Sequence, residues 1–389
     1  MKIGIFTDTY TPEINGVATS CNTLFNTLTK NSHEVYVFTT GKKTEIDETK
    51  HIIKISGKTI KRLYNYRLAL PFNHKVLKEI SKLNLDIIHV NTEYGVGILG
   101  FLTSKKYRIP LVYTFHTMYE YYTYYITKGF LDGLFKKLVR RLIIKYVNRA
   151  SEVIAPSENT KNYLQSIKCK KYINVVPTGI DLTKFLDYKI DDEKLRNLRK
   201  TLQIPEDFKI FVSLGRIAKE KNLKETIHYF DNFIKKHNIK AKLLIVGDGP
   251  YLSELKKEVK KDDENDNVLF LGRVEHQDVG LYYHLGDLFI NSSLSETQGL
   301  TYLEAIASNN IVLARNAPYL KNIIIDGESG FLYDNEEDFD NKLLMFLSLD
   351  KNKLDKIKEN ALKNINFYNI DNFYKKIMIV YNRAIKDLY

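Results

Sequence analysis

Short apolar runs alternate with longer helix-like stretches along the whole chain. In the first half, six runs are rich in Val, Ile, Tyr or Phe, and several end in small polar residues, which is typical of buried strands. They are residues 2–8, 34–40, 86–92, 111–117, 151–157 and 173–179. Because helix-like stretches separate them, we expect right-handed crossovers and a parallel sheet covered on both faces.

The second half repeats this pattern with five further runs. They are residues 208–216, 241–249, 267–273, 287–293 and 310–316. The polar, charged stretch Tyr188–Gln203 between the two series is the best candidate for a linker. The sequence therefore predicts an α/β protein of two facing Rossmann-like domains, residues 1–186 and residues 187–369.

The last segment of the chain, Asn369–Tyr389, comes after the second series is complete and has apolar residues at helical spacing. These residues are Phe373, Ile377, Val380, Tyr381 and Ile385. We expect residues 370–389 to form a helix that crosses back onto the first domain.

The composition is that of a soluble globular protein, with 389 residues, 44% of them hydrophobic and 27% charged. No stretch approaches eighteen uninterrupted apolar residues, so we expect no transmembrane helix. The amino-terminal MKIGIFTDTY is typical of a buried first strand and not of a signal peptide. Cys21 and Cys169 form neither a metal-binding spacing nor a disulfide framework, which fits a reducing cytoplasm.

The charge is distributed unevenly. Residues 1–190 hold 29 Lys and Arg against 15 Asp and Glu, whereas residues 191–389 hold 30 against 32. Such asymmetry indicates that the first half faces an anionic surface, either nucleic acid or membrane. The chain has no RNP-like strand and no Cys/His finger, which argues against nucleic acid. A nicotinamide dehydrogenase would need a third glycine that GDGPYL lacks.

Ligands of open parallel sheets bind beyond the carboxyl ends of the strands, so the residues after each run matter most. In the first half, Asp8 and a loop ending in Gly16 follow the first run, and His116 follows the fourth. Asp8 is equally well explained as a cap at the end of its strand or, by the family resemblance described below, as a contact to the sugar acceptor.

Two cations follow the first run of the second half. Arg216 and Lys221 lie in GRIAKEKNL, where Glu220 is a possible partner. A diphosphate needs such groups, because Arg forks across phosphate oxygens and Lys acts as a compact charge. Alone, each cation is better explained as a solvated surface residue.

Two carboxylates flank an expected helix start in SETQGLTYLEA, residues 295–305. Gly299 and Leu300 open the helix and offer backbone N–H groups to phosphates. Glu304, one turn in, is placed to accept from a ribose, and Glu296 from sugar hydroxyls. Each glutamate alone is better explained by the helix dipole. Together with the cations, they favour a nucleotide-sugar site.

These motifs resemble those of the retaining glycosyltransferases of family 4, which have the GT-B fold. SETQGLTYLEA is similar to their Glu-x7-Glu element, and GRIAKEKNL to their diphosphate-binding Arg and Lys. VPTGID followed by Phe185, and VGDGP, are also similar to family motifs. The segments TQG, FHTMYEYY and TDTYTPEINGV look most like the members that glucosylate diacylglycerol.

The resemblance implies a role for each matching residue. Glu296 would hold hydroxyls of the donor sugar and Glu304 the ribose. Arg216 and Lys221 would neutralise the leaving diphosphate as its charge grows in the transition state. Similar enzymes retain the anomeric configuration by front-face attack, with the leaving phosphate accepting the acceptor's proton, so we assign no protein nucleophile.

The resemblance also implies roles for residues outside the Glu-x7-Glu element and the diphosphate-binding loop. Gly16 would let the backbone approach donor and acceptor, and His116 would contact the transferred sugar near the reaction centre. Arg273 and Val274 would lie near the uracil. We expect no tightly bound cofactor and no metal held by the protein, because the best Asp-x-Asp match, residues 338–340, sits in a charged run typical of a solvated helix start. Stimulation by Mg²⁺ remains compatible with this.

Two stretches of the first half bear on the acceptor. Residues 118–130, which include Tyr119 and Tyr122, are unusually aromatic and predict either core packing or an interfacial lip for lipid tails. Residues 128–150 predict a basic amphipathic helix with a net charge of +6. Its expected apolar face is Leu131, Leu134, Phe135, Leu138, Leu142 and Ile143; its basic residues include Lys136, Lys137, Arg140, Arg141, Lys145 and Arg149.

Such a helix is typical either of a protein on an anionic membrane or of a packed helix with a basic outer face. We expect an enzyme that moves a hexose from UDP-glucose, or UDP-galactose, to diacylglycerol. It would act as a peripheral protein on the inner face of the cell membrane, with no nucleic-acid partner. The alternative is a family 4 glycosyltransferase with a soluble or other glycan or lipid acceptor.

Overall fold

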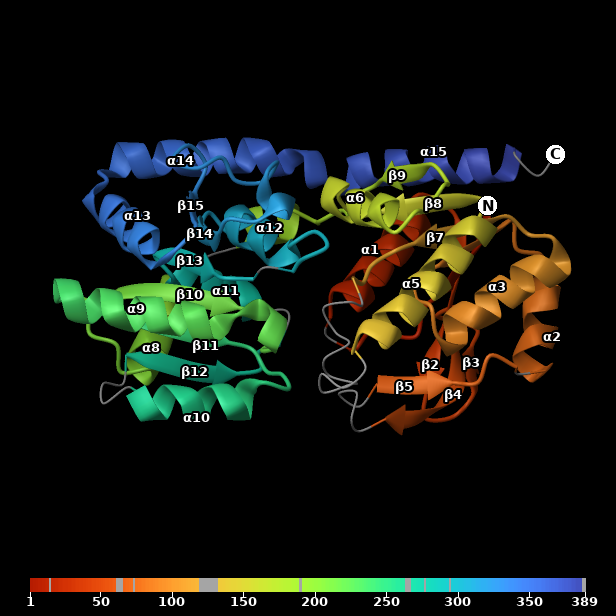
Figure 1. Cartoon of the computed structure of the whole chain (residues 1–389), viewed down its shortest axis with the longest axis horizontal. Helices are drawn as coiled ribbons and strands as arrows, with labels where there is room; N and C mark the ends of the chain where they lie inside the picture. Colours follow the sequence, from red (N-terminus) through yellow and green to blue (C-terminus); the bar gives the residue numbers. More distant parts are fainter. Residues whose placement is uncertain are drawn as a thin grey trace. The chain divides into compact units, whose positions relative to one another are not determined.

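The computed structural model describes residues 1–13, 15–60, 66–72, 74–118, 132–188, 191–262, 267–275, 278–293 and 295–386. The chain forms two compact units, called unit 1 and unit 2 below. Unit 1 is Met1–Gly179 with Ile370–Tyr389, and unit 2 is Ile180–Asn369 (Figure 1). The boundary between the first part of unit 1 and unit 2 lies after Gly179, whereas the boundary predicted from the sequence lies after residue 186. Ile180 belongs to unit 2 because its N–H donates to the carbonyl of Tyr368 at 2.8 Å.

The sheet of unit 1 has the strand order β3-β4-β2-β1-β6-β7-β8-β9, and β5 pairs with β4. Its strands are β1 (Lys2–Phe6), β2 (Glu34–Gly41), β3 (Glu45–Asp47), β4 (Ile52–Ile60), β5 (Tyr66–Ala69), β6 (Ile87–Val90), β7 (Leu111–Thr114), β8 (Glu152–Ala155) and β9 (Ile173–Val175). The six predicted strands are all present and pair in parallel. The sequence analysis missed β3, β4 and β5, of which β3 and β5 run antiparallel to β4.

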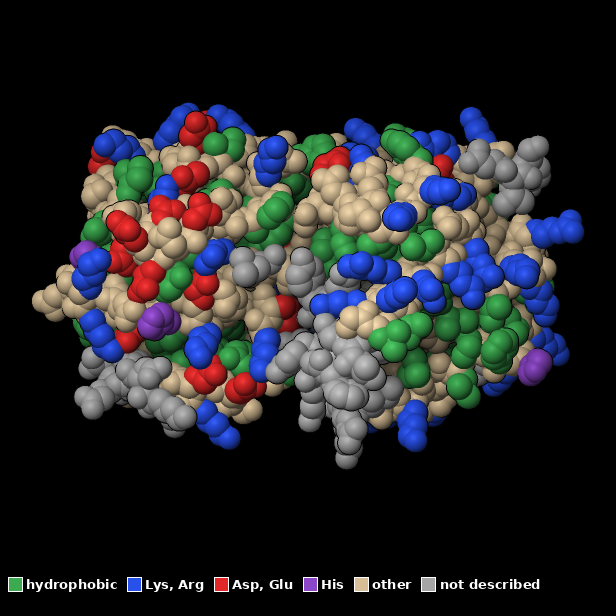
Figure 2. Space-filling model, viewed as in Figure 1, with side chains coloured by type: hydrophobic (Ala, Val, Ile, Leu, Met, Phe, Trp, Pro, Cys, Tyr) green, Lys and Arg blue, Asp and Glu red, His purple; other side chains and the backbone are tan. Residues whose placement is uncertain are grey.

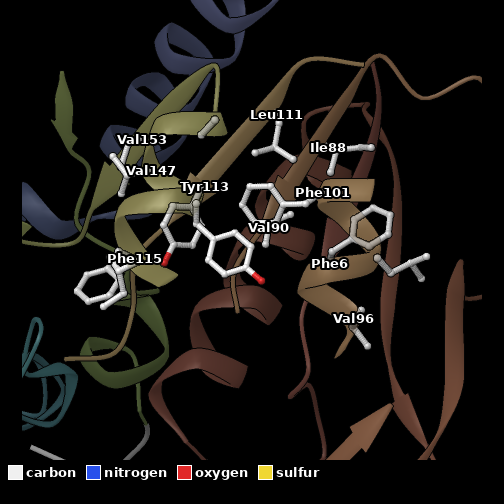
Figure 3. Packing of buried hydrophobic residues seen from close by; sticks show 14 of the residues in the cluster. Phe6, Ile88, Val90, Val96, Phe101, Leu111, Tyr113, Phe115, Val147 and Val153 are labelled. Atoms are coloured by element: carbon white, nitrogen blue, oxygen red, sulfur yellow. The ribbon is translucent and has the colours of Figure 1, made fainter. Parts of the chain in front are cut away.

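Helices cover both faces of this sheet because successive strand side chains point to opposite faces. The helices are α1 (Gly16–Lys30), α2 (His74–Leu83), α3 (Gly95–Tyr107), α5 (Asp132–Arg149), α6 (Glu158–Ser166) and α15 (Ile370–Lys386). On one face, Phe6, Val90 and Tyr113 pack with residues of α2, α3, α5 and α6 (Figure 3). On the other face, Ile5 and Val112 pack with α1 and α15.

The carboxy-terminal helix α15 packs on the sheet of unit 1, as the sequence predicts. The buried hydroxyl of Tyr381 lies 2.7 Å from Nδ1 of buried His89, and Nε2 of this histidine lies 2.6 Å from the Thr114 hydroxyl. Arg383 of the same helix donates to Glu152 of β8 at 3.0 Å. Polar contacts therefore fix the register of a helix whose apolar side is buried.

The sheet of unit 2 is parallel throughout, with the order β12-β11-β10-β13-β14-β15. Its strands are β10 (Lys209–Leu214), β11 (Ala241–Val246), β12 (Val268–Gly272), β13 (Leu288–Asn291), β14 (Ile311–Arg315) and β15 (Phe331–Tyr333). The five strands predicted for this half are present, and β15 was missed. The two sheets are separate, which confirms the prediction of two Rossmann-like units.

Helices also cover the sheet of unit 2. They are α7 (Thr183–Leu186), α8 (Asp192–Thr201), α9 (Leu223–His237), α10 (Leu252–Asp262), α11 (Val279–Leu285), α12 (Leu300–Ala307), α13 (Glu336–Ser348) and α14 (Lys351–Ile365). The stretch Tyr188–Gln203 was predicted to be a linker. This prediction is wrong, because the helix α8 occupies most of the stretch. Asp191 caps this helix by accepting from the N–H groups of Glu193 and Lys194. No residue of α8 is fully buried, and its apolar side is limited to Leu195 and Leu198, which are partly buried.

No helix in the described part of the chain is both long and apolar enough to cross a membrane.

Removal of the Tyr381 hydroxyl tests the attachment of α15. We expect Tyr381→Phe to lower the free energy of unfolding by about 1–3 kcal/mol, because buried His89 loses a hydrogen-bond partner that water cannot replace. Tyr374→Phe is the matched control, since Tyr374 lies on the same helix and contacts His33 at 3.0 Å where both are partly exposed. Urea unfolding should show a smaller loss for the control; equal losses would contradict the account.

Candidate active site

The strand order of unit 2 reverses between β10 and β13, which lie side by side in the sheet. The chain leaves β10 toward β11 on one side and leaves β13 toward β14 on the other. Loops that diverge in this way leave a crevice at the carboxyl ends of the two strands, where open α/β sheets bind ligands. Arg216 and Lys221 follow β10, and Glu296 follows β13.

Ion pairs hold both cations of this loop. The ammonium of Lys221, at the end of the short 3-10 helix Lys219–Lys221, contacts Oε1 of Glu296. Nη2 of Arg216 donates to Oε1 of Glu220 at 2.5 Å, and the Glu220 side chain is only 5% exposed. The structure thus brings the predicted Lys221 and Glu296 together. It also confirms Glu220 as a partner of Arg216.

The helix α12 begins beside this pair. Gly299 precedes it with φ 80°, a left-handed conformation, and an added Cβ would lie 2.7 Å from the Tyr302 ring, so glycine is required there. Gly299 has no side chain to cap this amino end, so the N–H groups of Leu300 and Thr301 are suited to another acceptor. Glu304 lies one turn further on.

Glu304 has an unusual electrostatic environment for a carboxyl group. Burial raises its pKa to about 7, and the hydrogen bond from the Tyr283 hydroxyl to Oε2, at 3.1 Å, acts in the opposite direction. No predicted feature pointed to Tyr283, which lies 21 positions earlier in the chain. The contact arises only because α11 packs beside α12.

Ser295 is a second residue that the sequence analysis missed. Its hydroxyl oxygen is buried and has no hydrogen-bond partner among the described residues. It lies directly before Glu296, at the loop that follows β13. A buried polar atom without a partner is costly, so this hydroxyl fits an additional contact to a polar ligand. One serine in the run NSSLS carries no sequence signal that distinguishes it.

The glycines of VGDGP serve loop packing. A Cβ on Gly247, whose φ is 141°, would lie 1.9 Å from the carbonyl oxygen of Gly215. A Cβ on Gly249 would lie 2.2 Å from the carbonyl oxygen of Ile217, whose N–H donates to Asp248. These glycines therefore allow the loop after β11 to pack closely against the loop that carries Arg216.

Arg273 and Val274 directly follow β12, at the same edge of the sheet as the other strand-end residues. The Arg273 side chain is exposed, whereas Val274 is partly buried and packs on the apolar core of unit 2. They lie two strands away from β10 in the sheet order.

In unit 1, Asp8 caps a helix. Its buried carboxylate accepts from the Thr92 hydroxyl at 2.6 Å and from the N–H groups of Val96 and Gly97, in the first turn of α3, at 2.9 and 3.4 Å. Asp8 is therefore a cap of α3, and its contact to the acceptor stays a prediction. Its oxygens serve the protein's own backbone.

His116 follows β7 and is oriented by Asn91, which follows β6. Nε2 of His116 lies 2.9 Å from Oδ1 of Asn91. Burial lowers the pKa of His116 to about 4, so the imidazole is neutral near pH 7. Because an amide oxygen only accepts, Nε2 carries the proton and Nδ1 is left as an acceptor. The sequence analysis named His116 but not Asn91.

Gly16 is the first residue of α1, and Asn15 caps that helix by accepting from the Ala18 N–H at 2.9 Å. A Cβ added to Gly16 would meet no atom within 4 Å. The fold itself therefore does not require glycine here. The role of Gly16 toward the substrates stays a prediction.

The helix α5 exposes a row of leucines. Leu134, Leu138 and Leu142, spaced four residues apart, are 57%, 52% and 37% exposed. The predicted apolar face is wrong at Ile143, which is buried in the core of unit 1. One position along a helix turns the side chain by about 100°, so Ile143 points inward where Leu142 points outward.

Basic side chains flank this row. Lys137, Arg140, Arg141, Lys145 and Arg149 are exposed and Lys136 is partly exposed. Figure 2 shows Lys and Arg side chains gathered where the yellow helix α5 of Figure 1 lies, with apolar side chains beside them. Tyr119, Tyr122 and Leu131 lie outside the described residues, and the Phe135 side chain is not described.

Unit 1 has further exposed apolar residues that the sequence analysis did not identify. Leu70 and Phe72, between β5 and α2, are 78% and 72% exposed. These two side chains are therefore open to contact with something outside the chain.

The described part of the chain contains no group of three or more His, Cys, Asp or Glu side chains that could hold a metal ion.

Comparison with known proteins defines the class of this molecule. The model for Glycosyltransferase Family 4 matches residues 14–184, and the model for Glycosyl transferases group 1 matches residues 195–364. The crystal structure of Anabaena Alr3699/HepE in complex with UDP and glucose has a TM-score of 0.77, with 19% identity over 97% of this chain and 98% of that one. The fold is therefore GT-B, as predicted.

Two relatives are similar over most of their length. The alpha-monoglucosyldiacylglycerol synthase of Streptococcus pneumoniae is 40% identical over 345 residues, 88% of this chain and 78% of that protein. The protein of the same name from Acholeplasma laidlawii is 34% identical over 344 residues, 87% and 86% of the two chains. The chain belongs to glycosyltransferase family 4, and the predicted resemblance is confirmed.

The close packing at Gly247 predicts a large stability difference between two glycines of unit 2. Gly247→Ala should lower the free energy of unfolding by about 3 kcal/mol or more, because a strained φ is combined with a steric overlap. Gly272→Ala, at φ 73° with no atom within 4 Å of the new Cβ, should cost about 1–2 kcal/mol. Urea unfolding of the full chain measures both. Similar losses would show that the loop contact is unimportant.

Proposed function

We propose that the strand-end site of unit 2 binds a UDP-sugar and that the enzyme transfers its hexose, with retention of configuration, to diacylglycerol. The observation that carries the donor assignment is the contact between Lys221 and Glu296, with Arg216 in the same loop and Glu304 on the adjacent helix. Two cations suit a diphosphate, and two carboxylates suit hydroxyl groups. The group is assembled at the switch point of the sheet, where such ligands bind.

Within this proposal each side chain has a defined task. Arg216 and Lys221 stabilise the negative charge that grows on the leaving diphosphate. Glu296 accepts from hydroxyls of the hexose, and Glu304 from those of the ribose. Arg273 and Val274, at the end of β12, lie near the uracil, and the N–H groups at Gly299 and Leu300 face the phosphates.

The transfer needs no covalent intermediate with the protein. The acceptor oxygen forms a bond to the anomeric carbon as the bond from that carbon to the diphosphate oxygen breaks. The diphosphate leaves with the electron pair and accepts the acceptor's proton. Gly16 allows close approach of the substrates, and neutral His116 contacts the transferred sugar through its unprotonated Nδ1.

The acceptor assignment is supported by the two synthases that share 40% and 34% identity with this chain. It is also supported by α5, where exposed leucines and exposed cations share one helix. Diacylglycerol stays in the bilayer, so an enzyme that uses it has to reach the surface. We infer that unit 1 binds anionic lipid on the inner face of the cell membrane through α5, and that Leu70 and Phe72 add apolar contact.

The direct test supplies UDP-glucose or UDP-galactose with vesicles that contain diacylglycerol or monoglucosyldiacylglycerol. Mass spectrometry of the extracted lipids should show one hexose on diacylglycerol, formed faster from UDP-glucose. If a soluble acceptor is used instead, neither lipid gains a sugar. In that case the assignment of a UDP-sugar as the donor would still hold, and the assignment of diacylglycerol as the acceptor would be wrong.

Substitution of the two cations tests the donor site. Arg216→Ala and Lys221→Ala should each reduce turnover roughly thirtyfold to a thousandfold, since the loss of a charge-assisted contact costs on the order of 2–4 kcal/mol. Glu296→Ala and Glu304→Ala should have effects of similar size. Lys219→Ala is the matched control, because Lys219 lies in the same turn but pairs with Glu254 at 3.1 Å.

Initial rates with saturating diacylglycerol and varied UDP-glucose measure these effects, and thermal unfolding confirms that each variant is folded. Turnover near that of the parent in both Arg216→Ala and Lys221→Ala would refute the diphosphate assignment.

Replacement of four cations of α5 tests the membrane contact. Lys136, Lys137, Arg140 and Arg141 changed together to Ser should weaken sedimentation with phosphatidylglycerol liposomes, because each cation near an anionic surface contributes about 1 kcal/mol. Binding should also fall as salt rises and be weak on zwitterionic liposomes. Binding of UDP-glucose should be unchanged.

The matched control changes four lysines of α14 in unit 2 to Ser. They are Lys351, Lys353, Lys356 and Lys363. This variant loses the same charge at a site remote in sequence from α5, so its sedimentation should match the parent. If the α5 variant sediments as well as the parent does, α5 is not the membrane contact.

A further inference from the structure

Tyr283 is a buried residue of α11 that lies under the candidate ribose site. Its hydroxyl donates to Oε2 of Glu304 at 3.1 Å, and the carbonyl oxygen of Thr301 lies 3.3 Å from the same hydroxyl. The backbone carbonyl of Tyr283 accepts from the side chain of Asn310. Both ends of this residue are therefore held.

The aromatic ring of Tyr283 is also held by packing. It is fully buried, with its centroid 5.7 Å from that of Phe289 and 6.4 Å from that of Phe185. A ring held in this way keeps its hydroxyl in one place. A glutamate side chain, by contrast, has three rotatable bonds, so its carboxylate needs a partner to stay in one orientation.

The Tyr283 hydroxyl is hydrogen-bonded to only one of the two carboxyl oxygens of Glu304. Oε2 of Glu304 accepts from Tyr283, and no donor among the described residues contacts Oε1. In that part of the chain no charged side chain of the neighbouring α7, α14 or β14 pairs with Glu304. Tyr283 is thus the group that orients this carboxylate.

We propose that Tyr283 is a positioning residue for the nucleotide: its hydroxyl holds one oxygen of Glu304 so that the other accepts the hydroxyls of the donor's ribose. This inference rests on the proposed function, because it takes Glu304 as the ribose contact. It adds a residue outside the Glu-x7-Glu element, on a different helix, that sets how that element binds.

The electrostatics of the pair give the proposal a measurable signature. Burial raises the pKa of Glu304 to about 7, and the Tyr283 hydrogen bond is the contact that lowers it. Burial keeps the pKa of Tyr283 well above its usual value, so this hydroxyl stays a donor. A protonated Glu304 accepts less well from the ribose, so affinity should fall as pH falls through about 7. Without the Tyr283 hydroxyl, that fall should begin at a higher pH.

The experiment measures the affinity for UDP-glucose by calorimetry between about pH 6 and about pH 9. UDP-glucose is chosen because its diphosphate is esterified at both ends and keeps its charge over this range. Tyr283→Phe should bind about tenfold more weakly than the parent near pH 7 and remain weaker, by a smaller factor, near pH 9, where Glu304 is ionised but no longer held in one orientation. Tyr333→Phe is the matched control, since it removes another buried hydroxyl that donates to a glutamate, Glu225, at 3.2 Å.

Glu304→Gln separates this inference from the proposed function. Its affinity should be low and independent of pH, because the amide cannot ionise. If Glu304→Gln binds like the parent, Glu304 is not the ribose contact and the proposed function is wrong at this residue. If it binds weakly but Tyr283→Phe matches the parent, or is weakened equally at every pH, Tyr283 does not position Glu304. Either result overturns the inference.

Discussion

The ion pair between Lys221 and Glu296 joins the two loops that leave the carboxyl ends of β10 and β13. A charge that is partly removed from water needs a partner, and here each partner comes from a different strand end. The same constraint applies to Arg216, which Glu220 holds. The loop after β11 can pack against this arrangement only because Gly247 and Gly249 have no side chains. These charged side chains are therefore assembled and paired within unit 2 itself. Under the proposed function, an anionic ligand would exchange these partners, and the protein would not have to gather scattered charges.

Three cations of α5 have the opposite arrangement. Lys137, Arg141 and Lys145 are exposed, and no carboxylate in the described part of the chain pairs with them. They flank leucines that are exposed instead of buried. Paired cations around a strand end suit one small anion with a fixed geometry. Unpaired cations along an exposed apolar row suit an extended surface that carries many anions, such as a bilayer. The positive charge of the first half and the charge balance of the second thus have different physical consequences.

The parallel strands and the strand-end residues could be predicted because strands buried on both faces give apolar runs, and their polar residues follow at fixed places. The strands β3, β4 and β5 were missed because they carry more polar residues, and because β3 and β5 pair with β4 as antiparallel neighbours without a helical crossover. α8 was taken for a linker because charged and polar residues dominate it, and Leu195 and Leu198 give it only a narrow apolar stripe. The sequence predicted that Lys221 and Glu296 follow neighbouring strand ends, but it gave no signal for the contact of Asn91 with His116 in unit 1 or of Tyr283 with Glu304 in unit 2. Those contacts depend on how neighbouring elements pack, which no local pattern records. The prediction that Ile143 shares a face with the exposed leucines was wrong for the same reason, since packing against the core of unit 1 decides which face of α5 is buried.

The most direct test of the central claim is a crystal structure of the enzyme with UDP-glucose. The account predicts phosphate oxygens within about 3.2 Å of the Arg216 guanidinium and the Lys221 ammonium. It also predicts the ribose hydroxyls on Oε1 of Glu304, with Oε2 still on Tyr283, and hexose hydroxyls on Glu296. A nucleotide bound at another edge of unit 2, or one whose phosphates contact neither Arg216 nor Lys221, would contradict it.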